Sequence, residues 1–410
     1  MIKHSTVIVG GGLVGGLTAL LLAKENIDVA VLDAAPLLDE NQVLEKMNSR
    51  VLALSQATIH LLKIAGVWPY IARYEPYTAM HVWNKNGYGE VDFGQESLKP
   101  PSENEWLGVM VEPSILNLAI QKTMLANVKN YHTQIRVKHL AQEIDGWRIQ
   151  LSNNTSLHTK LLIGADGANS FVRQEALIAM KVLDYKQSAI GCAIKTRKPH
   201  HHVARQIFLP TGPLAYLPLK SPTATENGYW QSIVWTLPTD VCNEYMSLDN
   251  QSFIEKLSQE SLYMLEGVTE VENRASFPLK ARSAEKYVQA GLALIGDAAH
   301  VIHPLAGQGV NIGCLDAAML SHILLEDLER SGVWANIQTL RKYESLRRHQ
   351  NEAMMHGMSI MGWLQASQSS SLIWVRSFGQ RVVMKSPKLK GFFLDQANGM
   401  HLLQRTRYHN

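Results

Sequence analysis

The stretch STVIVGGGLVGG, residues 5–16, decides the fold. Ser5 to Val9 is rich in β-branched residues, as in a buried parallel strand, and the glycines after it match the spacing GxGxxG. The apolar run Leu17 to Ala23 predicts a helix, and Asp28 to Asp33 predicts a second strand. Strand, glycine turn, helix and strand in this order form a βαβ unit. The unit predicts a parallel sheet with a right-handed crossover.

The three glycines of this turn have separate tasks. Gly10 lets the chain leave the strand sharply, Gly12 leaves room for a pyrophosphate, and Gly15 allows the helix to pack closely on the strand. The free N–H groups and the positive dipole end of the helix attract phosphate. Asp33 closes the second strand, where a carboxylate can hold ribose hydroxyls. This predicts a dinucleotide site but leaves FAD and NAD open.

Two later segments place an aspartate directly after an apolar run. Asp166 lies in GADGANSFVR, and Asp297 lies in LIGDAAHVIHPLAGQGVNIG. Ligands of open α/β sheets bind at the carboxyl ends of strands, and a buried carboxylate needs a hydrogen-bonding partner, such as a chain of sugar hydroxyls. The glycines 307 and 309 lead into a predicted helix near Val310, which adds a second backbone cradle. A site assembled from residues 10, 166 and 297 fits FAD better than NAD alone.

The pattern of elements predicts an α/β fold with an inserted, mainly antiparallel sheet. We predict a discontinuous FAD-binding domain, a substrate-binding β-sheet domain and a C-terminal helical region. The predicted limits are 1–74, 106–184 and 281–330 for the first, 75–105 and 185–280 for the second, and 331–410 for the third.

Composition is ordinary for a globular protein, with 46% hydrophobic and 18% charged residues among 410. No apolar run approaches the length of about 20 residues that spans a bilayer, and the N-terminus does not read as a signal peptide. Three scattered cysteines predict neither a disulfide framework nor a metal site, and they fit a reducing cytoplasm. Residues 331–410 carry eleven Lys and Arg against three Asp and Glu. This basic tail predicts either contact with an anionic surface or a solvated helical face.

Taken together, the motifs resemble those of the single-component flavin aromatic hydroxylases, of which 4-hydroxybenzoate hydroxylase has the best-known fold. The resemblance covers nearly the whole chain. HPLAGQGVNIG (303–313), NSRVLALS (48–55) and Val111-Glu112 are similar to the ubiquinone-biosynthesis branch, UbiH, UbiF and UbiI/VisC. Within that branch, the segments most similar to UbiI/VisC, which hydroxylates the ring carbon called C5, are VWNKNGYG (82–89), VARQIF (203–208), SIVW (232–235) and RKYESLRRHQ (341–350).

The resemblance implies an enzyme that hydroxylates a polyprenylphenol, at C5, through a flavin C4a-hydroperoxide formed from NADH or NADPH and O2. The flavin does the chemistry, so no side chain is certain to be catalytic; Pro304, Gly307 and Tyr216 are candidates, with Tyr216 as a plain core aromatic the alternative. The residues expected at the cofactor are Gly10, Gly12, Gly15, Asp33, Arg50, Asp166, Gly296, Asp297, Pro304, Gly307, Gln308, Gly309 and Asn311.

Other readings stay open from the sequence. They are another ring position or phenolic substrate, a flavin halogenase or prenyl-chain reductase on the same fold, and a non-catalytic scaffold in a complex of ubiquinone-biosynthesis proteins. The absence of a WxWxIP element speaks against a halogenase. We expect a cytoplasmic protein that binds no nucleic acid, with peripheral contact at the inner membrane left open.

Overall fold

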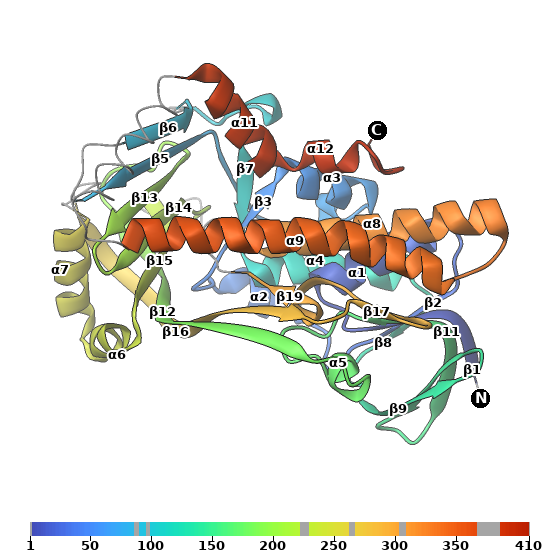
Figure 1. Cartoon of the computed structure of the whole chain (residues 1–410). Coiled ribbons are helices and arrows are strands. Elements are labelled where there is room, and N and C mark those ends of the chain that lie inside the picture. The colour runs from blue at the N-terminus through green and yellow to red at the C-terminus, as the bar shows by residue number, and fades with distance from the viewer. Residues whose placement is uncertain are drawn as a thin grey trace.

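The computed structural model describes residues 2–85, 90–95, 99–221, 229–261, 267–302, 309–366 and 386–409. Two large sheets lie side by side with a small sheet between them, and one long helix runs across the whole molecule (Figure 1).

The strands are β1 (Ile2–Val9), β2 (Val29–Leu32), β3 (Leu52–Ser55), β4 (Glu75–Tyr77), β5 (Ala79–Asn84), β6 (Glu90–Gly94), β7 (Gly108–Val111), β8 (Asn130–His132), β9 (Val137–Glu143), β10 (Gly146–Leu151), β11 (Ser156–Gly164), β12 (Met180–Thr196), β13 (Val203–Leu209), β14 (Gly212–Pro218), β15 (Tyr229–Pro238), β16 (Val268–Ala284), β17 (Val288–Gln289), β18 (Leu292–Leu294) and β19 (His300–Val301). The helices are α1 (Leu13–Lys24), α2 (Glu40–Glu45), α3 (Gln56–Ile64), η1 (Trp68–Tyr70), η2 (Glu103–Glu105), α4 (Pro113–Asn127), α5 (Phe171–Glu175), α6 (Thr239–Ser247), α7 (Asn250–Glu260), η4 (Gly296–Ala298), α8 (Gly309–Ser331), α9 (Ile337–Ala366), α11 (Pro387–Asn398) and α12 (Met400–Leu403).

The first sheet has the strand order β17-β18-β11-β1-β2-β8. Strand β1 pairs in parallel with β11 on one side and with β2 on the other, and β11 pairs in parallel with β18. The predicted βαβ unit is therefore confirmed. The pairing also brings the carboxyl ends of β1, β11 and β18 to one edge, although these strands lie far apart in the sequence.

Helix α1 is almost wholly buried because other elements surround it. It packs on α8, α4 and β2, and Leu17, Leu20, Leu21 and Leu22 are at most 3% exposed. A helix that is apolar all round belongs in a core, so its sequence suits this place. The glycine turn that precedes α1 is thereby held against the sheet.

The second sheet has the order β19-β16-β12-β15-β14-β13-β5-β6 and is mainly antiparallel, as predicted. Helices α6 and α7 pack against it. Its core includes Trp235, Phe253 and Tyr245, with the rings of Trp235 and Tyr245 5.1 Å apart. Long strands β12 and β16 extend from this sheet toward the first one (Figure 1).

A small sheet, β3-β7-β4, lies where the chain passes from the first sheet to the second. The prediction placed residues 75–77 in the inserted sheet, but β4 pairs with β7 instead, and the chain joins the second sheet only at β5. The C-terminal helix α12 packs on α3 and α8, and α11 lies above the small sheet in Figure 1. No helix in the described part of the chain combines the length and the apolar character that a bilayer crossing requires.

Candidate cofactor site

The glycine turn after β1 has a shape that only glycine permits at two positions. Gly10 has a φ of 104°, and a Cβ atom there would lie 2.3 Å from the carbonyl oxygen of Ala165. A Cβ atom on Gly15 would lie 2.0 Å from the carbonyl oxygen of Gly10. Gly12 is different, because a Cβ atom there would meet nothing within 4 Å. The turn is thus closed on its protein side and open at Gly12, which is the geometry of a phosphate cradle.

Asp33 lies beside this cradle at the end of β2. Its Oδ2 accepts a hydrogen bond from the Gly11 N–H at 2.8 Å, and its Oδ1 accepts one from the Ala35 N–H at 2.8 Å. Each carboxylate oxygen has a further lone pair. The side chain is therefore fixed by the protein and can still accept hydrogen bonds from ribose hydroxyls.

Asp166, which follows β11, supplies an acceptor that lacks a partner. Its Oδ2 accepts a hydrogen bond from the Val172 N–H at 3.0 Å. Its Oδ1 is buried and has no hydrogen-bond partner within the described residues. Leaving such an atom unpaired is costly, so the site fits a ligand that brings a hydroxyl group to this oxygen.

Asp297 lies in η4, directly after β18, and its side chain is exposed at the same edge of the sheet. The protein that surrounds the carboxylate raises its pKa above the ordinary range, and His300 and Arg50 act in the opposite direction. Arg50 is exposed and lies over the Phe277 ring, with its guanidinium carbon 4.6 Å from the ring centroid. Arg50 thus places a positive charge near Asp297, on the side of the second sheet.

Asn311 has a structural task that the sequence did not reveal. Its side chain is 3% exposed and accepts hydrogen bonds from the Ser55 N–H at 2.9 Å and the Thr58 hydroxyl at 2.8 Å. It also donates one to the carbonyl oxygen of Ala53 at 2.8 Å. Asn311 therefore fastens the first turn of α8 to β3 and α3.

Of the remaining candidate residues, three lie outside the described part of the chain and two lie within it. Pro304, Gly307 and Gln308 lie outside the described residues, while Gly309 is the first residue of α8. Tyr216 is 1% exposed in the core that includes Cys192 and Phe253, whereas its neighbour Leu217 packs with the residues around Tyr77. Successive side chains of a strand point to opposite faces. Tyr216 thus faces the core of the second sheet, which favours the interpretation as a core aromatic over a ring contact.

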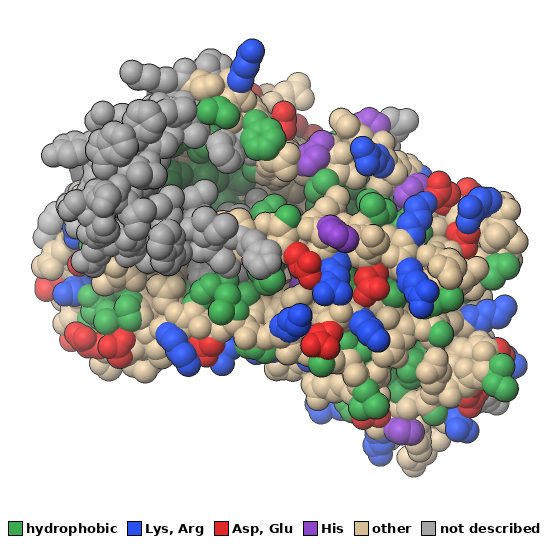
Figure 2. All heavy atoms as spheres, viewed as in Figure 1, with side chains coloured by type: hydrophobic (Ala, Val, Ile, Leu, Met, Phe, Trp, Pro, Cys, Tyr) green, Lys and Arg blue, Asp and Glu red, His purple; other side chains and the backbone are tan. Residues whose placement is uncertain are grey.

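Next to Asn311 lies a cavity of about 90 Å³. Ser55 and Asn311 border it on the side of α8, and Leu394, Ala397 and Asn398 of α11 border it on another side. The other described residues in its wall are mainly apolar: Ala53, Tyr77, Met80, Phe93 and Leu107. Figure 2 shows the surface hollowed between α11 and the body of the molecule. The cavity therefore lies between the small sheet, the second sheet and α11.

The residues fit FAD. Four features follow strands that end at one sheet edge: a cradle open at Gly12, the carboxylate of Asp33, the buried Asp166 oxygen that has no partner among the described residues, and the exposed carboxylate of Asp297. Gly12 suits the pyrophosphate, Asp33 suits the ribose, and Asp166 and Asp297 suit the hydroxyl groups of the ribityl chain.

A buried charged group that the sequence did not single out lies behind this edge: Asp316 of α8 is bonded to Arg347 of α9.

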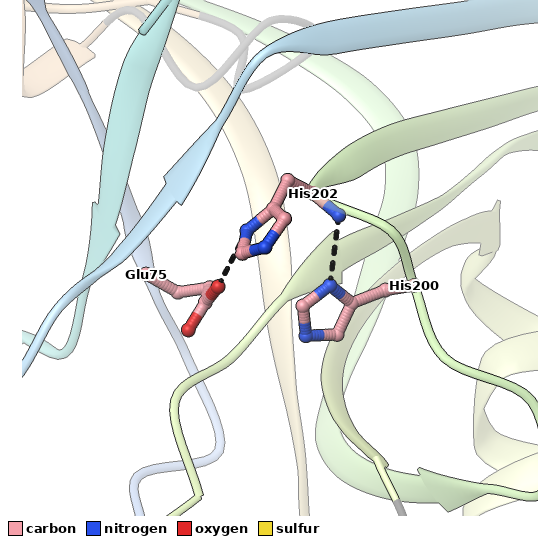
Figure 3. Close-up of side chains that lie close together, drawn as sticks. All are labelled: Glu75, His200 and His202. Carbon is pink, nitrogen blue, oxygen red and sulfur yellow. Dashed lines mark hydrogen bonds and ion pairs between the residues drawn. The ribbon is translucent and has the colours of Figure 1, made fainter. Parts of the chain in front are cut away.

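One further cluster joins the small sheet to the turn before β13 (Figure 3). His202 Nδ1 lies 2.8 Å from a carboxylate oxygen of Glu75, and this hydrogen bond raises the pKa of His202, although burial and Lys220 oppose it. His200 accepts the His202 N–H on Nδ1 at 3.1 Å, and burial lowers the pKa of His200 to about 4. A neutral His200 with Nδ1 as acceptor carries its proton on Nε2, which leaves no free lone pair for a metal. The cluster is therefore a hydrogen-bonded group that ties β4 to the turn before β13.

Comparison with known proteins gives consistent matches. A family model described as FAD binding domain matches residues 3–357. The chain is 33% identical to the 3-demethoxyubiquinol 3-hydroxylase of Escherichia coli (strain K12), over 96% of this chain and 98% of that one. It is 30% identical to a mitochondrial ubiquinone biosynthesis monooxygenase of Danio rerio, over 94% of this chain and 87% of that one. The crystal structure of p-nitrophenol 4-monooxygenase PnpA from Pseudomonas putida DLL-E4 shares the fold, with a TM-score of 0.75 at 18% identity over 97% of this chain and 99% of that one.

Proposed function

We propose, since this chain belongs to the FAD binding domain family of flavin-dependent monooxygenases, that it hydroxylates the aromatic ring of a polyprenylated phenol in ubiquinone biosynthesis. The observation that carries the proposal is the cavity beside Asn311, because it adjoins the first turn of α8 and is lined mainly by apolar side chains. Such a wall suits an aromatic ring and the start of an isoprenoid tail.

In this proposal, the redox chemistry would be supplied by FAD, with NADH or NADPH as the electron donor and O2 as the source of the hydroxyl oxygen. The protein would hold the cofactor and the substrate in position and provide an apolar surrounding for the substrate ring. Asn311 fixes the first turn of α8, whose positive dipole end would stabilise negative charge on the reduced cofactor. The apolar wall formed by Tyr77, Met80, Phe93 and Leu107 excludes water from the ring.

The finer part of the proposal is the ring position. The similarity of residues 82–89, 203–208 and 341–350 to UbiI/VisC supports C5. The test uses purified protein, a prenylphenol, NAD(P)H and ¹⁸O₂, with mass spectrometry and NMR of the product. We expect one labelled oxygen atom in the ring at C5. Label at another carbon would contradict the position alone, whereas label only in peroxide or water would contradict the hydroxylase.

The proposed path of the substrate's isoprenoid tail past α11 can be tested separately. Ala397 borders the cavity from α11, so Ala397→Trp should obstruct the tail and lower kcat/KM for a long-chain prenylphenol by about tenfold, or roughly 1.4 kcal/mol. FAD binding should not change. Gln396→Trp is the matched control, since the adjacent exposed residue does not border the cavity. If the two variants have equal kcat/KM values, the tail does not pass α11.

We also propose that α11 contacts an anionic membrane surface. Lys388, Leu389 and Phe392 are exposed on this helix, and Figure 2 shows hydrophobic and Lys or Arg side chains together over α11. A basic residue near an anionic leaflet contributes about 1 kcal/mol, and apolar side chains add shallow insertion.

Co-sedimentation with anionic liposomes at low and high salt checks this contact. Wild-type protein should bind in a salt-sensitive way, and Lys388→Glu combined with Phe392→Ser should bind several-fold more weakly. The control is Lys129→Glu, which reverses an exposed charge far from α11 in the sequence. Equal binding of wild type and the α11 variant would speak for delivery of the substrate by a partner protein.

A further inference from the structure

Behind the flavin-binding edge lies a buried charged group that the proposed chemistry does not use. Asp316 on α8 is 0% exposed and Arg347 on α9 is 1% exposed. Arg347 Nε donates a hydrogen bond to Asp316 Oδ1 at 2.7 Å, and His300 Nε2 lies 2.5 Å from Asp316 Oδ2. Burial by itself would raise the pKa of Asp316, but the charges and hydrogen bonds of His300 and Arg347 hold it well below the ordinary range. The carboxylate is therefore ionised inside the protein.

This carboxylate holds both ends of the turn that carries Asp297. Its Oδ2 accepts a hydrogen bond from the Gly296 N–H at 3.0 Å and faces His300 Nε2. Gly296 has a φ of 56°, a conformation that few residues other than glycine adopt. The His300 ring is also stacked on Tyr287, with the centroids 5.8 Å apart. One oxygen atom thus spans the turn from Gly296 to His300, and Asp297 lies between these two contacts.

Helix α9 holds Asp316 in turn. Besides its bond to Asp316, Arg347 donates to the carbonyl oxygen of Ile312 at 3.1 Å and to Asn351 Oδ1 at 3.0 Å. The Tyr343 hydroxyl, one helical turn earlier, donates to the carbonyl oxygen of Leu294 at 3.0 Å. Helix α9 therefore fixes β18, which precedes the turn, and the carboxylate behind it.

We propose that Asp316 is a positioning residue for FAD, which sets the geometry of the turn Gly296–His300, and that Arg347 keeps its carboxylate in place. The inference does not depend on the substrate proposed above. Its simpler rival is that the buried pair only stabilises the packing of α8 on α9. The two accounts differ in what they predict for FAD affinity, because a packing role has no consequence for FAD once the protein is folded.

The test compares two equivalent substitutions on one helix. Asp316→Asn removes the charge and leaves the Gly296 N–H and Arg347 with a poorer acceptor. Asp327→Asn is the matched control, because Asp327 on α8 is 6% exposed, pairs with Arg330 and accepts the Thr339 hydroxyl of α9, but lies further along the helix. FAD affinity is measured by flavin fluorescence quenching, below the melting temperature of each apoprotein. We expect Asp316→Asn to weaken FAD binding at least about tenfold and Asp327→Asn to change it less than twofold.

A double variant separates stability from positioning. Replacing a buried ion pair with apolar residues often restores stability, so Asp316→Leu combined with Arg347→Met should recover the melting temperature that Asp316→Asn loses. Its FAD affinity should stay low, because the turn still lacks its acceptor. Recovery of FAD affinity together with stability would overturn the proposal, as would FAD binding by Asp316→Asn within twofold of wild type. If Asp316→Asn does not fold, the double variant alone decides between the two accounts.

Discussion

Asp297→Ala is expected to purify with most of its flavin lost and to bind added FAD about 10- to 100-fold more weakly than wild type, since hydrogen bonds to a charged group contribute roughly 1.5–3 kcal/mol each. The carboxylate is exposed in η4, just after β18, and we expect it to accept hydrogen bonds from the ribityl hydroxyls. The melting temperature of the apoprotein should change little, because none of the described residues forms a hydrogen bond or ion pair with this exposed side chain. Flavin absorbance of the purified protein and a fluorescence titration with FAD check both expectations.

Asp240→Ala serves as the control for this experiment, since Asp240 is an exposed aspartate on α6, outside the cofactor site. It should retain its flavin. Asp297→Asn should fall between wild type and Asp297→Ala, because the amide oxygen is a weaker acceptor than a carboxylate. An Asp297→Ala protein that is fully loaded with flavin and active would show that another group holds the ribityl chain.

The second large effect distinguishes two glycines that are three residues apart. A Cβ atom on Gly15 would lie 2.0 Å from the backbone oxygen of Gly10, so Gly15→Ala should destabilise the protein by more than about 2 kcal/mol. Gly12 has extended backbone angles, with φ of −68° and ψ of −171°, and open space around its Cα. Gly12→Ala should therefore change the stability of the apoprotein by less than about 1 kcal/mol.

The same pair should behave differently toward FAD. The methyl group of Gly12→Ala occupies the space that the pyrophosphate needs, so this variant should fold normally and bind FAD at least about tenfold more weakly. Thermal unfolding of the apoproteins and FAD titration provide the two measurements. If Gly12→Ala binds FAD as wild type does, the phosphate cradle is not at this position, and Gly15 would keep only its packing role.

The parts of the fold that follow from local patterns could be predicted from the sequence. The βαβ unit follows from a β-branched run, spaced glycines and an apolar helix, and each aspartate of the site directly follows an apolar strand. These signals are local because strand, turn and helix preferences act over a few residues. The antiparallel character of the second sheet was predictable for the same reason.

Other features depend on contacts that no local pattern reveals. GPLAYLPL (212–219) is apolar at nearly every position, so the alternation that would tell which face Tyr216 takes is missing. The bond between Asp316 and Arg347 joins two helices and depends on how α8 packs on α9. The same holds for β4, which could pair either with β7 or with the inserted sheet and pairs with β7. Tertiary packing, and not the local sequence, decides which pairing forms.

The order of strands in the first sheet has a consequence for biosynthesis. Strand β1 pairs with β11, and β11 pairs with β18. The N-terminal strand therefore cannot enter its sheet until these strands have been synthesised, much later than β1 itself. At about 5–20 residues per second, the ribosome needs tens of seconds to add the segment between them. Sheets built from such distant strands form slowly, because loop closure precedes the gain from pairing. The nascent chain therefore leaves the apolar helix α1 without its contacts to α8 until α8 has been synthesised, so we expect the cofactor site to be completed only late in folding.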